Sequence, residues 1–177
     1  MKEKKESLMN YIFMFAIAII LALLIRHFVF TSNIVSGVSM EPSFQNNDRL
    51  IALVFPLYLK DPEYSDVVII ESPIEENKEY IKRIIAKPRD NVLIENGSVY
   101  VNGNKLNEPY IEQGVETQIY NDFFWTLDEN QYFVLGDNRN PGKSSDSRVF
   151  GPIEREAIKG IVKFRFWPLS KFGVIGG

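Results

Sequence analysis

The sequence of 177 residues contains no cysteine and only one histidine, His27. The lack of cysteine excludes disulfide bonds, thiolate zinc sites and a cysteine nucleophile. Because only one histidine is present, a transition-metal site is not expected either. The chain has no excess of basic residues, and its net charge of -3 at pH 7 gives no reason to expect a nucleic-acid partner. No internal repeat or low-complexity linker divides it, so one folded domain is expected.

A long apolar run lies near the N-terminus, where residues 11–25 carry no charged side chain. A helix of about 20 residues, with a rise of about 1.5 Å each, crosses a hydrocarbon layer of about 30 Å. We therefore predict a transmembrane anchor at residues 10–30, preceded by a cytoplasmic segment at 1–9. Three lysines among the first five residues favour this orientation, which places a β-rich domain, residues 31–177, on the extracytoplasmic side. A cleaved signal peptide is the alternative interpretation of the apolar run.

Short β-rich runs separated by turn-forming residues fill the rest of the sequence. Asn-Gly pairs that begin at positions 96 and 102 are strong hairpin signals, because both residues tolerate positive φ. A short helix begun by proline is predicted at residues 152–158, and residues 112–130 remain unassigned. Strands are predicted at residues 49–54, 66–71, 80–86, 92–95, 98–101, 131–135 and 159–167. The expected fold is mainly β: an antiparallel β-sheet domain that follows one N-terminal transmembrane helix.

Ser39 stands in a Ser-Met-x-Pro turn after the apolar run and is a candidate nucleophile. A serine hydroxyl is a weak nucleophile near neutral pH unless a neighbouring base takes its proton. The usual base is histidine, but His27 lies within the apolar N-terminal segment. A Ser-His-Asp triad is therefore excluded unless that segment folds back onto the domain, and a lysine must act as the base.

Lys82 is the best placed lysine for this role, within the β-rich run Glu-Tyr-Ile-Lys-Arg-Ile-Ile-Ala. Alternation along a strand puts Tyr80, Lys82 and Ile84 on one face, which is apolar apart from the amine. An amine with the ordinary lysine pKa of about 10.4 is charged at neutral pH and cannot accept a proton. We therefore expect burial to lower the pKa of Lys82, and we expect the carboxylates of Glu79 and Asp146 to point away from it.

Two further motifs follow in a polar loop, Gly-Asp-Asn-Arg at residues 136–139 and Ser-x-Asp-Ser-Arg at residues 144–148. Each of these short patterns is weak alone, because serine, lysine and Gly-Asp patterns recur by chance. Together, Ser-Met-x-Pro, Tyr-Ile-Lys-Arg and the two loop motifs, in this order after one hydrophobic segment, resemble a bacterial type I signal peptidase. The resemblance extends from residue 11 to residue 167.

This resemblance implies a membrane-anchored serine endopeptidase that removes signal peptides from exported preproteins at the bacterial cell membrane. It implies that Ser39 is the nucleophile, Lys82 the general base, and Ser144 a residue that orients the lysine amine. The substrate would bind in an extended conformation and add a strand beside Val35 and Ile81, with small residues, as in Ala-x-Ala, at the cleavage site. The implied partners are preprotein signal peptides and membrane lipids, and no cofactor or metal is needed.

Charged residues that support this implied site are Arg83, Asp146 and Arg148. Because Arg83 follows Lys82 along the strand and faces the other way, we predict that it forms a salt bridge, with Asp146 as the candidate partner. In some family members a serine two residues before the nucleophile helps to bind the oxyanion, but this chain has Gly37 there. Backbone donors would then carry that role.

Asn47 and Arg89, each followed by an aspartate, stand where the family pattern usually has glycine. These departures predict altered turns with the chemistry retained. Self-cleaving repressors resembling LexA also have a Ser-Lys β domain, but they carry a DNA-binding domain where this chain has its apolar run. The other alternative is an inactive anchored paralogue that binds peptides or secretion machinery, and the presence of both Ser39 and Lys82 argues against it.

Overall fold

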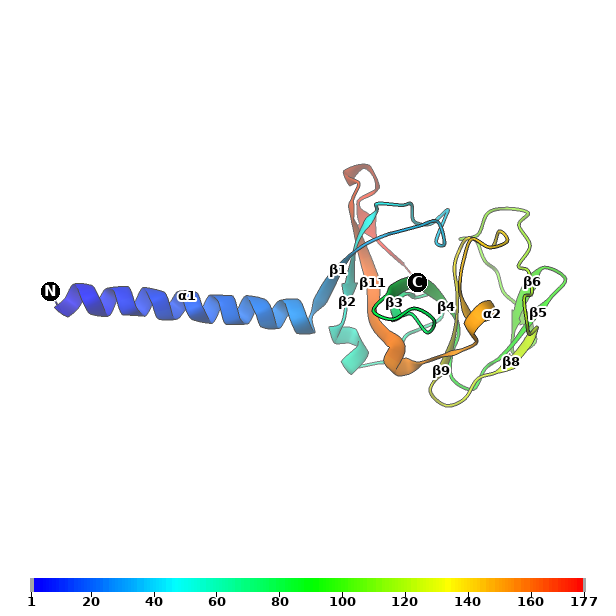
Figure 1. The fold of residues 1–177 in the computed structure, drawn as a ribbon, viewed down its shortest axis with the longest axis horizontal. Coiled ribbons are helices and arrows are strands. Elements are labelled where there is room, and N and C mark those ends of the chain that lie inside the picture. The colour runs from blue at the N-terminus through cyan, green and yellow to red at the C-terminus, as the bar shows by residue number, and fades with distance from the viewer. Residues whose placement is uncertain (1, 177) are drawn as a thin grey trace.

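The computed structural model describes residues 2–176, apart from the side chains of residues 2–8 and 24–28. A long helix, α1 (Lys2–Phe28), extends away from a β-rich domain (Figure 1). No helix within the described residues is both long and apolar enough to cross a membrane. The transmembrane anchor predicted at residues 10–30 is therefore not confirmed, and the side chain of His27 lies outside the described residues.

Eight strands form the larger sheet, and all their pairings are antiparallel. Their order is β1, β2, β11, β3, β4, β9, β10, with β12 paired to β11. The strands are β1 (Phe30–Ile34), β2 (Arg49–Leu53), β3 (Val67–Glu71), β4 (Glu79–Ala86), β9 (Gln131–Leu135), β10 (Ile153–Glu154), β11 (Ile158–Trp167) and β12 (Gly173–Val174). The prediction of a mainly β, antiparallel domain is confirmed.

A smaller sheet of four strands lies at the end of the domain that is far from α1 (Figure 1). Its order is β7, β6, β5, β8, and both predicted Asn-Gly turns form, since Asn96 and Asn102 have φ of 50° and 52°. Its strands are β5 (Asn91–Glu95), β6 (Ser98–Val101), β7 (Asn104–Lys105) and β8 (Phe124–Thr126). All strands predicted from the sequence form, each with ends within one residue of those expected.

Helix is scarce in the β-rich domain. It is limited to α2 (Ser147–Phe150) and three 3-10 turns, η1 (Phe55–Tyr58), η2 (Arg155–Ala157) and η3 (Leu169–Lys171). Of the helix predicted at residues 152–158, only the 3-10 turn η2 forms, because Ile153 pairs with Tyr132 in the sheet and packs with Ile158 in the same apolar cluster. Strand β1 was not predicted, since its side chains alternate only between exposed and half-buried and give a weak apolar pattern.

Strand β3 is buried on both faces, as its unbroken Val-Val-Ile-Ile run indicates. Val67 and Ile69 pack on one face with Met40 and Phe44, in a cluster that we call the nucleophile-side core. Val68 and Ile70, which alternate with them along β3, pack in a second cluster on the other face. A third cluster joins the two sheets and includes the ring of Trp125. The nucleophile-side core holds the segment around Ser39 against β3, because Val35, Met40 and Phe44 belong to it.

Two turns contain non-glycine residues in the left-handed region, at the positions where the family pattern has glycine. Asn47 and Arg89 both have φ of 70°. Asparagine visits this region readily, whereas a residue such as arginine pays about 1 kcal/mol to adopt it. The backbone conformation that glycine favours is thus present at both positions, despite the side chains.

Candidate active site

The segment that carries Ser39 is fixed by apolar side chains on either side of it. Val35, Met40 and Phe44 are buried in the nucleophile-side core. Burial of a side chain of this size stabilises the fold by about 1.5 to 3 kcal/mol. The backbone N–H of Phe44 donates to the carbonyl of Met40 at 2.9 Å, and that of Val35 donates to the carbonyl of Asp48 at 2.8 Å. Ser39 is therefore half-buried on a turn with little freedom to move.

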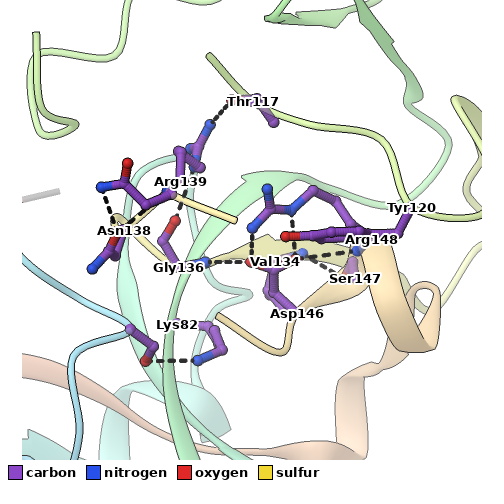
Figure 2. Close-up of polar contacts among 12 residues, drawn as sticks. Lys82, Thr117, Tyr120, Val134, Gly136, Asn138, Arg139, Asp146, Ser147 and Arg148 are labelled. Carbon is purple, nitrogen blue, oxygen red and sulfur yellow. Dashed lines mark hydrogen bonds and ion pairs between the residues drawn. The ribbon is translucent and has the colours of Figure 1, made fainter. Parts of the chain in front are cut away.

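The side chains of Lys82 and Ser39 meet in this structure, with 3.0 Å between Nζ and Oγ (Figure 2). Lys82 lies on β4 and is 2% exposed. Burial lowers the pKa of Lys82 to about 8, because removing water disfavours the charged amine. The carboxylates of Asp146 and Asp137 oppose this shift, and the charge of Arg148 adds to it. A serine hydroxyl thus lies beside an amine that is partly neutral near pH 8.

The acidic residues Glu79 and Asp146 near Lys82 have polar partners other than its amine. The carboxylate of Glu79 accepts a hydrogen bond at 3.0 Å from Nδ2 of Asn33, which lies on β1. The carboxylate of Asp146, which we also expected to point away from Lys82, lies close enough for its charge to raise the pKa of the amine. It remains close because Arg148 and the backbone N–H of Gly136 bind its oxygens. Burial of the amine outweighs this opposing charge.

The loop at residues 136–139 forms hydrogen bonds with the backbone around the nucleophile. The backbone N–H of Asn138 donates to the carbonyl of Ser39, and Asn138 Nδ2 donates to the carbonyl of Val38, both at 3.0 Å. A Cβ atom at Gly136 would lie 2.4 Å from the Ser39 carbonyl oxygen and 2.3 Å from Ser144 Oγ, so only glycine fits. These roles of Gly136 and Asn138 were missed, although the Gly-Asp-Asn-Arg motif had marked the loop.

Two buried ion pairs flank the site, and one predicted pairing is wrong. Arg83 binds Asp137 through two contacts of 2.8 and 2.6 Å, and Arg148 binds Asp146 through two of 2.8 and 2.7 Å. The predicted salt bridge between Arg83 and Asp146 does not form. The reason is strand register, because Arg83 pairs with Leu135, only two residues before Asp137.

Ser144 is buried near Gly136, but within the described residues its hydroxyl makes no hydrogen bond. The role inferred for it, orientation of the Lys82 amine, stays a prediction.

A cleft of about 470 Å³ lies over the pair of Ser39 and Lys82, and both Val35 and Ile81 line it. The pairing of β9 with β4 begins at Arg83. The first half of β4, residues 79–82, therefore has a backbone edge that β9 does not cover. Within the described residues, no group of histidine, cysteine, aspartate and glutamate side chains is arranged to hold a metal ion.

Comparison with known proteins agrees with this geometry. The family described as "Signal peptidase, peptidase S26" matches residues 8–167. Signal peptidase I of Bacillus licheniformis is 36% identical over 177 residues, which cover 96% of this chain and 94% of that protein. A probable signal peptidase I-2 of Synechocystis is 40% identical over 164 residues, with coverages of 89% and 72%.

A crystal structure of a signal peptidase I from Enterococcus faecalis is 30% identical and covers 58% of this chain and 97% of its own, with a TM-score of 0.48. The family match and the two sequence relatives define the class of protein, a serine peptidase. The chain belongs to the signal peptidase family, peptidase S26, and within it to the bacterial type I enzymes.

Proposed function

We propose that the protein removes signal peptides from exported preproteins by means of a Ser-Lys dyad, with Ser39 as nucleophile and Lys82 as general base. The observation that carries this proposal is the 3.0 Å separation of Nζ and Oγ at a buried amine. The lowered pKa of about 8 gives Lys82 a neutral fraction that can accept a proton.

In the proposed mechanism, neutral Lys82 takes the proton of Ser39 as Oγ attacks the carbonyl carbon of the scissile bond. The backbone N–H of Ser39 is the candidate donor to the developing oxyanion, because Gly37 supplies no hydroxyl. Lys82 then returns the proton to the leaving amine, and an acyl-enzyme remains on Oγ. Water activated by Lys82 hydrolyses this ester and restores both side chains.

The proposed substrate is an extended peptide with small residues before the scissile bond. Its backbone would add to the uncovered edge of β4 beside Ile81 and face Val35 across the cleft. Bulky side chains would contact the walls of this cleft before the carbonyl reached Ser39.

Incubation of the purified protein with a synthetic peptide that contains an Ala-x-Ala site tests this function. We expect one cut, after the second alanine, identified by mass spectrometry of both products. The matched control is the same peptide with phenylalanine in place of both alanines, and we expect it to remain intact. Cleavage of both peptides at equal rates, or of neither, would contradict the proposed specificity.

We place Arg83, Asp146 and Arg148 in the role of supports for the dyad. The pair of Arg83 and Asp137 holds the 136–139 loop beside β4. Arg148 orients Asp146, whose carboxylate accepts a hydrogen bond from the backbone N–H of Gly136, at the end of β9. Removal of one partner of a buried pair costs about 3 to 5 kcal/mol, because the other charge is left uncompensated. These residues therefore act through the structure of the site, whereas Ser39 and Lys82 act on the substrate.

We also propose that α1 anchors the domain to the bacterial cell membrane, with residues 31–177 on the extracytoplasmic side. Support comes from large apolar side chains on α1 that are exposed to water in the isolated chain, such as Tyr11 (66%), Phe13 (67%) and Phe15 (70%). A surface of this kind favours lipid over water.

The membrane proposal predicts that the full-length protein stays in the membrane pellet after an alkaline carbonate wash. Protease added to intact protoplasts is expected to digest the domain. A variant with Phe13→Asp and Phe15→Asp is expected to shift into the supernatant, because charges on the helix are costly in lipid. Release of the unaltered protein by carbonate, or protection of the domain until lysis, would refute the proposed location.

A further inference from the structure

Residues 106–122, here called the connecting segment, lie between β7 and β8 and contain no strand or helix. Its second half, residues 112–122, belongs to the stretch that could not be assigned from the sequence. The segment is tied to the smaller sheet at two points, by the backbone N–H of Leu106, which donates to Val99, and by that of Thr117, which donates to Gly97, both at 2.9 Å. Other polar contacts of the segment are made with residues 139–142, next to the active site.

Arg139 is the main contact between the connecting segment and the active site. Its side chain is 1% exposed and is enclosed by acceptors. Nη1 donates to Thr117 Oγ1 at 2.7 Å, and both terminal nitrogens bind the carboxylate of Glu108. Nε donates to the carbonyl of Gly136 at 2.9 Å. Figure 2 shows the guanidinium directed toward Thr117, away from Lys82.

The loop held by Arg139 is the loop that holds the nucleophile. Within four residues, Asn138 donates two hydrogen bonds to the carbonyls of Val38 and Ser39, and Gly136 lies against the Ser39 backbone. A continuous set of contacts therefore runs from the connecting segment through Arg139 to the backbone of Ser39.

Two tyrosines of the connecting segment reach the ion pairs on either side of this loop. The ring of Tyr110 lies 4.1 Å from the guanidinium carbon of Arg83, and its hydroxyl donates to Glu108 at 3.0 Å. The ring of Tyr120 lies 5.2 Å from that of Arg148 (Figure 2). The segment thus touches each of the three buried arginines around the site.

We propose that Glu108 and Thr117 are positioning residues for catalysis: they hold Arg139, and through it the loop that fixes Ser39 relative to Lys82. The proposal rests on the proposed role of Ser39 as nucleophile. Without Glu108, a buried guanidinium loses its counter-charge and moves toward water, which displaces the loop. A displacement of about 1 Å at a nucleophile lowers the rate by about 100-fold.

The predicted effect is on kcat and not on KM. Val35 and Ile81, which line the cleft, make none of the contacts described for the connecting segment. Substrate binding should therefore be retained while the geometry of attack is lost. Lys82 stays buried and Asp137 stays paired with Arg83 on β4, so the pH at which activity reaches half its maximum should not move.

We expect Glu108→Ala to lower kcat for the Ala-x-Ala peptide by about 10- to 100-fold, with KM within twofold of the unaltered enzyme. Glu108→Gln, which keeps an acceptor oxygen, should recover part of the loss. Thr117→Val, which has the same shape but no hydroxyl, should lower kcat by a smaller factor. It provides a second test of the proposal in case Glu108→Ala does not fold. The control is Glu129→Ala, which removes the carboxylate of an exposed pair with Arg89 and should behave as the unaltered enzyme.

Normal kcat in both folded Glu108→Ala and Thr117→Val would overturn this inference. So would a loss of kcat that equals the unfolded fraction measured by circular dichroism, or a loss confined to KM. The failure of the proposed function is distinguishable, because it would appear as activity in Ser39→Ala. If Ser39→Ala is inactive while Glu108→Ala is fully active, only the positioning role is wrong.

Discussion

Replacement of Ser39 by alanine, or of Lys82 by methionine, is expected to lower the cleavage rate of the Ala-x-Ala peptide by at least about 10⁴-fold. The double variant should be no slower than either single one. This non-additivity follows because a nucleophile and its base act as one unit. Once either is removed, the other no longer contributes to the rate. Rates of all three purified proteins, measured by product formation under saturating peptide, check this result.

Methionine is the informative replacement for Lys82 because it fills a similar volume in a site that is 2% exposed. The matched control is Lys78→Met. Lys78 lines the same cleft, but the carboxylate of Glu75 raises its pKa, so it stays charged and cannot act as the base. We expect Lys78→Met to retain activity. Substantial turnover by Lys82→Met, or a double variant much slower than both single ones, would rule out the dyad.

The strands were predictable because their signals are local. Asn-Gly turns, apolar runs such as the one in β3, and prolines mark the ends of strands without knowledge of the rest of the chain. The proximity of Ser39 and Lys82 is not local, since 43 positions separate them. It was predicted through the order of motifs that the chain shares with a family, and neither residue alone would have sufficed.

Side-chain partners were harder to predict than strands. Alternation correctly sends Arg83 away from Lys82, but it cannot say whether Asp137 or Asp146 lies opposite. That choice depends on the register between β4 and β9, where Arg83 faces Leu135. A shift of register changes every cross-strand partner while leaving the pattern of each strand intact. The sequence therefore predicted that Arg83 would form a salt bridge, but not with which aspartate.

The connecting segment shows a second limit of prediction from sequence. Glu108 and Thr117 sit in a polar stretch without periodicity, which by itself indicates a surface loop. Their positioning role depends on contact with the buried side chain of Arg139, which lies 31 positions after Glu108 and 22 positions after Thr117. Burial of a charged residue in a loop motif could have been suspected from the Gly-Asp-Asn-Arg pattern, but its acceptors carry no signal of their own.

Activity is expected to rise with pH through a single ionisation near pH 8, the value to which burial lowers the pKa of Lys82. At that pKa the neutral fraction of the amine is about 10% at pH 7 and about 90% at pH 9. We therefore expect kcat/KM to increase about tenfold between these two values and to level off above pH 9. An ordinary lysine would instead give a rise of about tenfold per unit that continues to pH 10.

The same shift in pKa must appear in the stability of the protein, with a sign that can be worked out. The folded state binds the Lys82 proton less tightly than the unfolded state, so below pH 8 the charged amine destabilises the fold. A lowering from 10.5 to about 8 corresponds to about 3 kcal/mol at about 1.36 kcal/mol per unit. The penalty fades as the pH rises from 8 to 10.5, because the unfolded state then loses its proton too.

We expect Lys82→Met to lack this pH dependence, so the unaltered protein should gain stability relative to the variant over that range, as measured by urea denaturation. If the difference between the two proteins stays constant from pH 7 to pH 10, and activity shows no inflection near pH 8, then Lys82 is an ordinary charged lysine and cannot be the base.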